Sequence, residues 1–139
     1  MYLNNKQIQV ETDKCLGCKN SQCELKCPLH LSAKHFIQLY KEQKYEEMIT
    51  YLYMSNPFAE ICGLVCPNKF CMMNCIRKNI DNPVNIKGLQ ASLSHNFKHL
   101  LGVYFKHNNK KIAVIGGGVA GLTSAWYLSL QGYNIDIFV

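Results

Sequence analysis

The spacing of apolar residues divides the chain into two parts with different periods. From about residue 32 to residue 102, apolar side chains recur every three or four positions, as in helices that bury one face. After residue 110, two short apolar runs flank one further helical pattern. The pattern therefore predicts a mostly α-helical domain followed by the start of an α/β unit.

Two helices are predicted directly after the first cysteine group. In "AKHFIQLYKEQ", Phe36 and Leu39 share one face, and Ser32 stands in the N-cap position. "YEEMITYLYM" predicts a second helix that ends at Asn56-Pro57. The pair resembles a helical repeat, but no second copy follows at a fixed period.

The other segments of the first part give weaker patterns. Residues 1–14 are predicted to form an extended or fraying lead-in. "FAEICGLVCP" and "KFCMMNCIRK" predict two short helices that carry cysteines. "DNPVNIKGLQASLSHNFKHLLG" predicts a turn at Pro83, a helix from about Ile86, and a stop at Gly102.

The C-terminal part is typical of a strand–helix–strand unit. Residues 103–109 are predicted to be a linker. "KKIAVIG" predicts a buried strand, "LTSAWYLSLQG" a helix that ends at Gly132, and "YNIDIFV" a second strand. Two strands and one helix cannot bury both faces of a parallel sheet. We therefore expect a helical domain over 1–105 and an incomplete α/β domain over 106–139, as the N-terminal piece of a longer protein.

Eight cysteines lie within the first 75 residues, and none follows. The N-terminal residues lack the apolar core of a signal peptide, and the longest apolar run is too short and glycine-rich to span a bilayer. We therefore expect a cytoplasmic protein, without membrane partners, whose thiols stay reduced and available for metal.

The basic balance does not indicate a nucleic-acid partner. The formal net charge is +6, but the lysines are scattered rather than arranged in a stripe. Seven thiolates on two [4Fe–4S] cores would lower the net charge to about +3. The positive excess is better explained as compensation for buried anionic clusters.

The cysteine spacing favours iron–sulfur clusters. The first group is Cys15-x2-Cys18-x4-Cys23-x3-Cys27 followed by Pro28, and the second is C-x3-C-P-x3-C-x3-C, from Cys62 through Cys66 and Cys71 to Cys75. Three close cysteines and a fourth before proline are typical of two-cluster ferredoxins, in which the fourth binds the other cluster. The x4 gap departs from that pattern. The x3 spacings place cysteines one helical turn apart, on one face.

Two other interpretations remain open from the residues alone. A structural zinc site prefers two paired ligand knuckles, and only Cys15 and Cys18 form such a pair. A disulfide framework needs an oxidising compartment. The zinc interpretation would make the chain a helical binding module without enzymatic activity.

A glycine motif, Gly116-x-Gly118-x-x-Gly121, follows the predicted strand and opens the predicted helix. In this context the motif predicts a dinucleotide site, in which the glycines allow a tight turn, close approach of a pyrophosphate, and helix–strand packing. The acidic residue expected at the end of the second strand does not occur before Val139, and Asp136 lies mid-strand. We therefore expect this chain alone to bind FAD weakly or not at all.

No catalytic residue is predicted. His95 and His99 are four residues apart, as in some zinc sites, but lack a third ligand and are interpreted as a polar helix face. No Ser–His–Asp grouping or carboxylate pair indicates hydrolysis.

Four ordered motifs carry a resemblance to a known family: "CLGCKNSQCELKCP", "ICGLVCPNKFCMMNC", "NPVNIKGLQ" and "KKIAVIGGGVAGL". The chain resembles the N-terminal region of dihydropyrimidine dehydrogenases, including the NAD-dependent subunit type, and of the glutamate synthase small subunit. The resemblance covers nearly all of residues 10–139. It implies an α-helical domain with two [4Fe–4S] clusters, ahead of an FAD-binding domain.

The resemblance also implies the ligand sets. Cys15, Cys18, Cys23 and Cys75 would bind one cluster, and Cys27, Cys66, Cys71 and the side chain of Gln90 the other. Cys62 matches a cysteine that does not act as a ligand. The pyrimidine enzymes have glutamine where glutamate synthase has glutamate, so Gln90 favours the pyrimidine branch.

The function implied is electron transfer. In the full enzyme, NAD(P)H would reduce FAD, and electrons would pass through the two clusters to an FMN site in a partner subunit or domain. The alternative within the family is a glutamate synthase small-subunit-like electron donor.

Overall fold

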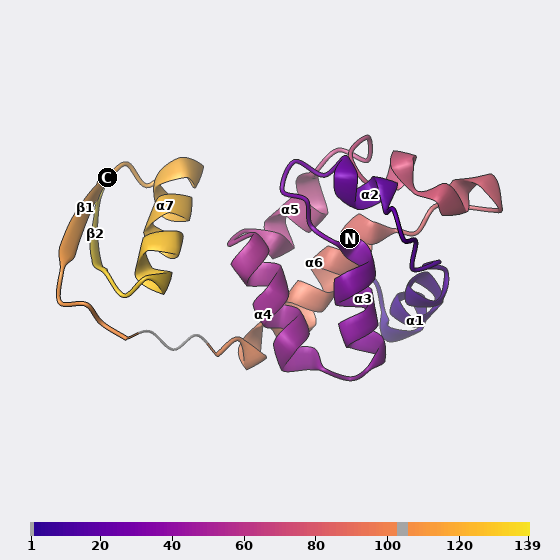
Figure 1. The fold of residues 1–139 in the computed structure, drawn as a ribbon, viewed down its shortest axis with the longest axis horizontal. Coiled ribbons are helices and arrows are strands. Elements are labelled where there is room, and N and C mark those ends of the chain that lie inside the picture. Colours follow the sequence, from indigo (N-terminus) through magenta and orange to yellow (C-terminus); the bar gives the residue numbers. More distant parts are fainter. Residues whose placement is uncertain (1, 103–105) are drawn as a thin grey trace. The chain divides into compact units, whose positions relative to one another are not determined.

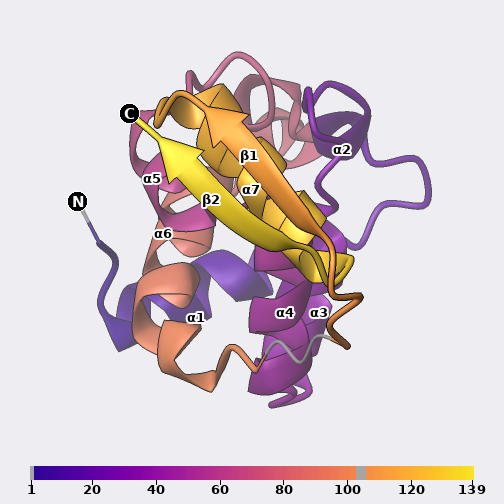
Figure 2. The same cartoon turned by 90° about the vertical axis from the view of Figure 1, so that its left-hand side faces the viewer.

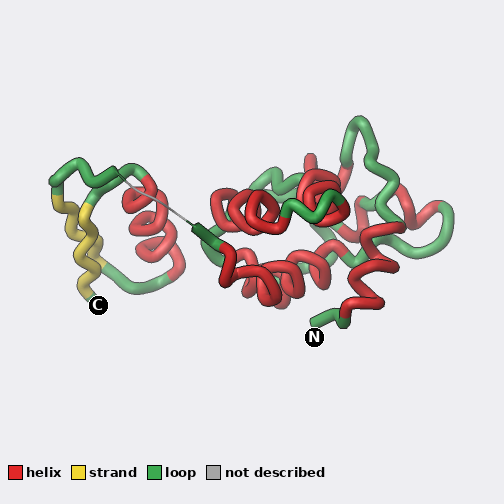
Figure 3. The backbone as a smooth tube through the Cα atoms, turned by 90° about the horizontal axis from the view of Figure 1, so that it is seen from below, coloured by secondary structure: helices red, strands yellow, loops and turns green. Residues whose placement is uncertain are grey.

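The structure, a computed structural model, describes residues 2–102 and 106–139. It divides into two compact units, Met1–Leu101 and Gly102–Val139. In the described residues the first unit consists of helices and loops, and the strands lie in the second (Figures 1 and 3). The mostly α-helical fold class with an incomplete βαβ unit is confirmed.

The N-terminal lead-in contains a helix, so the prediction of an extended or fraying segment is wrong for most of it. Helix α1 spans Asn5–Asp13. The side chain of Asn4 accepts a bond from the Gln7 backbone N–H at 2.9 Å, and the Gln7 side chain accepts one from the Asn4 N–H at 2.9 Å. This capping box starts the helix, and Ile8 and Thr12, four residues apart, bury one face of it.

The two helices predicted after the first cysteine group are present. Helix α3 spans Ala33–Lys41, and α4 spans Tyr45–Ser55 and ends at Asn56. The side chain of Ser32 makes no capping bond, and its hydroxyl has no hydrogen-bond partner in the described part of the chain. Its backbone N–H instead donates to the Tyr51 hydroxyl at 2.9 Å.

The cysteine-bearing segments are short and irregular. Helix α2 spans Gln22–Leu25, and α5 spans Ala59–Val65. The segment predicted as one short helix over "KFCMMNCIRK" instead forms two 3-10 turns, η1 over Met72–Asn74 and η2 over Ile76–Asn79. They are separated by Cys75, whose backbone is extended. Cys71 and Cys75, four residues apart, therefore do not lie on one face of an α-helix as their spacing predicts.

Helix α6 is the central element of the first unit. It spans Ile86–Phe97 and continues as a 3-10 turn, η3, over Lys98–Leu100, so it ends before the predicted stop at Gly102. It contacts α1, α4 and α5, and Figure 1 shows it running between the other helices. Fully buried side chains from α6 and its neighbours make up much of the hydrophobic core, among them Ile8, Phe36, Met48, Ile49, Leu52, Val84, Leu89 and Leu93.

The second unit is a parallel two-stranded sheet with one helix. Strand β1 spans Lys111–Ile115, α7 spans Val119–Leu130, and β2 spans Asn134–Phe138. Figure 2 shows the strands side by side with α7 behind them. The prediction of a buried first strand is wrong for this structure: β1 alternates between exposed and partly buried residues, because α7 covers one face of the sheet only.

The predicted linker joins the helical part of the chain to the α/β part. Residues 103–105 of the predicted linker, and with them the predicted boundary between residues 105 and 106, lie outside the described residues.

Within the described ranges, 2–102 and 106–139, none of the helices has both the length and the apolar character that crossing a bilayer requires.

Candidate metal centre

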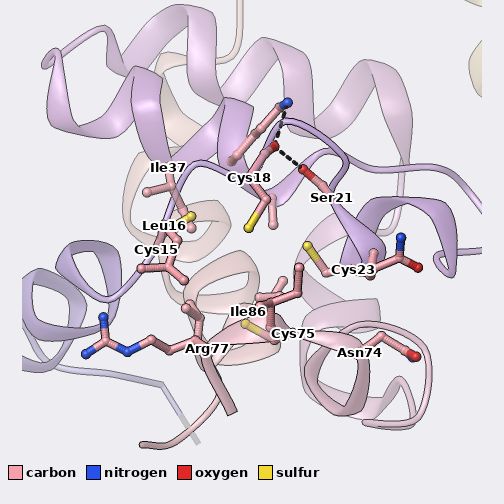
Figure 4. A pocket seen from close by; sticks show the side chains of 15 residues that line it. Cys15, Leu16, Cys18, Ser21, Cys23, Ile37, Asn74, Cys75, Arg77 and Ile86 are labelled. Atoms are coloured by element: carbon pink, nitrogen blue, oxygen red, sulfur yellow. Dashed lines mark hydrogen bonds between the residues drawn. The ribbon is translucent and has the colours of Figure 1, made fainter. Parts of the chain in front are cut away.

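Four cysteines line one cavity in the first unit. Cys15, Cys18 and Cys23 come from the loop after α1 and from α2, and Cys75 comes from the break between η1 and η2. The empty space between them is about 420 Å³, part of it open to solvent. Figure 4 shows sulfur atoms of Cys18, Cys23 and Cys75 turned toward this space. Helix α2 contacts η1, and this contact brings the two distant cysteine groups together.

Backbone geometry and side-chain bonds shape the cysteine loop. Gly17 has φ of +61°, a left-handed conformation that glycine adopts without strain. The carbonyl oxygen of Cys18 accepts two bonds, from the Ser21 hydroxyl at 3.0 Å and from the Lys34 ammonium at 3.1 Å (Figure 4). The loop between Cys15 and Cys23 is therefore bound to helix α3.

The segment after Cys75 is bound to the N-terminal part of the chain. The Arg77 guanidinium donates to the carbonyl oxygen of Lys14 at 3.4 Å, and it binds the Asp81 carboxylate through Nε at 2.6 Å and Nη2 at 2.7 Å. Lys14 directly precedes Cys15. These bonds tie the backbone beside Cys75 to the backbone beside Cys15.

A second, larger cavity lies next to the first. Its empty space is about 780 Å³, part of it open to solvent, and Cys23 lines both cavities. Its wall also holds four further cysteines, two amides and one lysine: Cys27, Cys62, Cys66, Cys71, Asn56, Gln90 and Lys87. The two cavities therefore lie side by side, with Cys23, Ala33 and Ile86 in the wall of both.

The amide of Gln90 has a defined orientation. The side chain is 9% exposed, and its Nε2 donates to the carbonyl oxygen of Ala59 at 2.7 Å. Because a carbonyl oxygen accepts only, the amide nitrogen must face Ala59. The amide oxygen is then left for the cavity that Gln90 lines. A buried glutamine with a fixed donor and a remaining oxygen is suited to bind a metal through that oxygen.

Gly63 permits the close approach of α5 to α6. A Cβ atom at this position would lie 2.5 Å from the backbone nitrogen of Ala91 and 2.9 Å from its Cα atom. The contact places Cys62 and Cys66, on either side of Gly63 in the chain, next to Gln90, the neighbour of Ala91. The second cavity depends on this contact between backbones.

Burial and neighbouring thiols raise the pKa of at least one cysteine in each cavity. The pKa of Cys23 is raised to about 11, first by burial, then by Cys75 and to a smaller extent by Cys15. Burial likewise raises the pKa of Cys71, and the neighbouring Cys66 and Cys27 raise it further. Buried thiolates this close repel one another, so a positively charged metal core is needed to hold them ionised together.

The donor geometry fits a cluster better than one metal ion. All eight cysteines are free thiols. Among residues 2–102 and 106–139, no three His, Cys, Asp or Glu side chains converge on a single-ion site. Zinc holds its thiolates at about 2.3 Å, around one point, whereas the irons of a cubane lie at separate corners and take more widely spaced sulfurs. Four thiols line the first cavity, and five thiols and the Gln90 amide line the second, so each has enough donors for the corners of such a cubane.

The structure brings the predicted ligands to two cavities. Every one of the eight lines at least one cavity, and the thiol of Cys62 lines the second cavity as well. The spacing of the cysteines does not predict the contacts of Lys34 and Ser21 with the Cys18 carbonyl, or that of Gln90 with the Ala59 carbonyl. The only signal for Lys34 is its place in the first turn of a predicted helix, which is too general to assign it a contact.

The glycine motif adopts the geometry that a dinucleotide site needs. Gly116 follows β1 with φ of +104°, and Gly118 is the N-cap of α7 with open space beside it. A Cβ atom at Gly121 would clash with the carbonyl oxygen of Gly116. A different physical reason therefore favours glycine at each of the three positions. The space beside the N-terminus of α7 leaves room for a phosphate.

The histidine pair, His95 on α6 and His99 in η3, does not form a metal site in the described residues. The Nδ1 atom of His95 lies 2.9 Å from the Glu60 carboxylate, and its ring stacks on Tyr2 at a centroid distance of 4.4 Å. The Tyr2 hydroxyl and the Lys98 ammonium also donate to Glu60, which lowers the pKa of that carboxyl to about 2. These bonds attach the N-terminus and α6 to α5.

Comparisons with known proteins agree with this geometry. The family described as dihydropyrimidine dehydrogenase domain II, 4Fe-4S cluster, matches residues 1–100, and the family described as NAD(P)-binding Rossmann-like domain matches residues 114–138. The resemblance inferred from the four motifs is thereby confirmed.

Curated relatives extend over nearly the whole chain. The β subunit of an NADPH-Fe(3+) oxidoreductase from Geobacter sulfurreducens is 36% identical over 99% of this chain and 21% of its own length. The glutamate synthase [NADPH] small chain of Escherichia coli is 31% identical over 95% of this chain and 29% of its own length. The NAD-dependent dihydropyrimidine dehydrogenase subunit PreT of Escherichia coli is 29% identical over 92% of this chain and 32% of its own. The chain thus spans a fifth to a third of these relatives.

Proposed function

Because the chain belongs to the dihydropyrimidine dehydrogenase domain II 4Fe-4S family, we propose that it transfers electrons through two [4Fe–4S] clusters. It would do so as the N-terminal portion of an NAD(P)H-dependent iron–sulfur flavoprotein oxidoreductase. The observation that carries the proposal is the pair of thiol-lined cavities that share Cys23 in their walls. Adjacent cavities allow an electron to pass between neighbouring centres without leaving the helical unit.

The proposed ligands follow the two cavities. Cys15, Cys18, Cys23 and Cys75 would hold the first cluster, and Cys27, Cys66, Cys71 and the amide oxygen of Gln90 the second. Iron–sulfur clusters, when bound, supply one-electron redox chemistry. The helical unit supplies fixed positions for the thiolates, mostly apolar cavity walls, and hydrogen bonds that hold the ligand-bearing segments.

The remaining cofactors and partners are proposed from the family and from the relatives' names. Gly116, Gly118 and Gly121 would contribute to an FAD site that needs further residues, with NAD(P)H as the source of the hydride in the whole protein. The electrons would leave through an FMN-containing catalytic subunit or domain. The proposed location is the cytoplasm, because thiols stay reduced there and are available for cluster assembly.

The pyrimidine branch is favoured over the glutamate synthase branch by one ligand. Gln90 stands where the pyrimidine enzymes have glutamine and glutamate synthases have glutamate. The buried, oriented amide of Gln90 supports its use as a ligand. The proposed electron acceptor is therefore a site that reduces a pyrimidine.

Electron counting tests this function. We expect anaerobically purified chain, reduced with dithionite and freed of excess reductant, to deliver about two electrons to ferricyanide, one from each cluster. A zinc-stabilised helical module would deliver none. Delivery of no electrons by a fully metallated chain would refute the electron-transfer function.

Changing Gln90 is expected to shift the potential of one cluster only. In Gln90→Glu or Gln90→Cys, an anionic ligand replaces a neutral one, so the second cluster becomes more negative by one charge unit. Adding an electron to it then costs more, and its reduction potential falls. EPR-monitored redox titration measures this shift, with the first cluster as the reference within the same sample. Unchanged potentials and spectra in both variants would remove Gln90 from the ligand set.

A further inference from the structure

The carbonyl group of Cys18, in the first cysteine loop, accepts hydrogen bonds from two side chains. It accepts the Ser21 hydroxyl at 3.0 Å and the Lys34 ammonium at 3.1 Å, both drawn as dashed lines in Figure 4. Ser21 is close in the chain, whereas Lys34 comes from α3, a helix that contributes Phe36, Ile37 and Leu39 to the core. The bond from Lys34 therefore holds the backbone of Cys18 in a fixed position relative to α3.

The ammonium of Lys34 also brings positive charge to the wall of the first cavity. Two cationic side chains, Lys34 and Arg77, line this cavity, and no carboxylate lines it in the described part of the chain. The two cations differ in their partners. Arg77 binds the carboxylate of Asp81 through two nitrogens, which offsets its charge. Lys34 is half-buried and bonds to a neutral carbonyl oxygen.

We propose that Lys34 is a positioning residue of the first cluster that also sets its reduction potential. The proposal rests on the proposed function, because it takes Cys15, Cys18, Cys23 and Cys75 as ligands of that cluster. The first cluster, with four thiolates, carries about one unit more negative charge than the second. A cation without a bound carboxylate in the cavity wall stabilises the reduced form, and so raises the potential.

The positional and electrostatic roles of Lys34 are separable by substitution. Lys34→Met removes the hydrogen bond and the charge, whereas Lys34→Gln removes the charge but keeps a donor amide. Lys34→Arg keeps both the charge and a hydrogen-bond donor, although the arginine side chain is longer and ends in a planar guanidinium. Ser21→Ala removes the other bond to the same carbonyl and leaves the charge in place. Lys41, on the same helix, pairs with Asp13 at 3.4 Å and lies outside the cavity lining, so Lys41→Met is the matched control.

EPR-monitored redox titration of the anaerobically purified chain tests the proposal, with the second cluster as the reference in every sample. Lys34→Gln and Lys34→Met are expected to lower the potential of the first cluster and leave that of the second. In Lys34→Arg, the potential of the first cluster is expected to stay closer to that of the unchanged protein than in Lys34→Gln or Lys34→Met. Lys41→Met is expected to leave both potentials unchanged, and Ser21→Ala is expected to change the potential of the first cluster less than Lys34→Gln does, because the charge of Lys34 remains.

The outcomes separate this proposal from the proposed function. Loss of the first cluster alone in Lys34→Met, with retention in Lys34→Arg, also supports the positioning role. Equal shifts of both clusters, or an unchanged first potential in Lys34→Gln, would overturn the proposal while the two-cluster function stands. A wild-type chain that holds no iron would overturn both.

Discussion

Replacing Cys75 by serine is expected to remove the first cluster and to leave the second, although Cys75 lies in the second cysteine group of the sequence. In the structure Cys75 lines the cavity of Cys15, Cys18 and Cys23. Conversely, Cys27→Ser is expected to remove the second cluster, because Cys27 lines the cavity of Cys66 and Cys71. Each variant should lose about half of the iron and sulfide, roughly four of eight atoms of each.

A second substitution shows which cluster remains. In Cys75→Ser the surviving cluster should have Gln90 as a ligand, so adding Gln90→Glu is expected to lower its potential. In Cys27→Ser the surviving cluster should not respond to Gln90→Glu. If the surviving cluster responds to Gln90→Glu in Cys27→Ser but not in Cys75→Ser, each cysteine group of the sequence holds its own cluster. That result would contradict the assignment of Cys75 to the first cluster and of Cys27 to the second.

Cys62→Ser is the matched control for these variants. Its thiol lines the second cavity but is proposed to bind no iron. The variant is therefore expected to keep both clusters and about eight irons per chain. Loss of the second cluster in Cys62→Ser would add Cys62 to the ligands and contradict the proposed set.

Gly63→Ala is expected to destabilise the helical unit and to empty the second site before the first. The added Cβ atom would lie 2.5 Å from the backbone nitrogen of Ala91, and neither backbone can move without shifting its helix. Overpacking of this kind costs about 1–3 kcal/mol in the free energy of unfolding. Moving α5 away from α6 also separates Cys66 from Gln90.

Anaerobic denaturant unfolding followed by circular dichroism measures the loss of stability, and EPR measures the loss of the second cluster. Val65→Ala is the matched control on the same helix, since Val65 is 73% exposed. Its stability and cluster content should stay close to those of the unchanged protein. A Gly63→Ala variant with unchanged stability and both clusters would contradict the close contact between α5 and α6.

The helices that the sequence predicts well are those with a single continuous apolar face. Phe36 and Leu39 on α3 and the Asn56-Pro57 stop after α4 are local signals, and the structure follows them. Helix α1 was missed because its apolar face is short, even though Asn4 and Gln7 form a capping box that three-residue spacing reveals. Cys75 interrupts a helical pattern because its position is decided by the cavity it lines rather than by local propensity.

The sites themselves are only partly encoded in local spacing. Cysteine spacing indicates clusters, but which cysteines meet depends on tertiary contacts between α2 and η1 and between α5 and α6. The bonds from Lys34 to the Cys18 carbonyl and from Gln90 to the Ala59 carbonyl join residues 16 and 31 positions apart. Such contacts leave no periodic signal, so the sequence alone does not predict them.

Iron and acid-labile sulfide analysis of the anaerobically purified chain tests the two-cluster account most directly. The account predicts a coloured protein with about eight irons and eight sulfides per chain. A colourless, zinc-loaded protein without sulfide would contradict it.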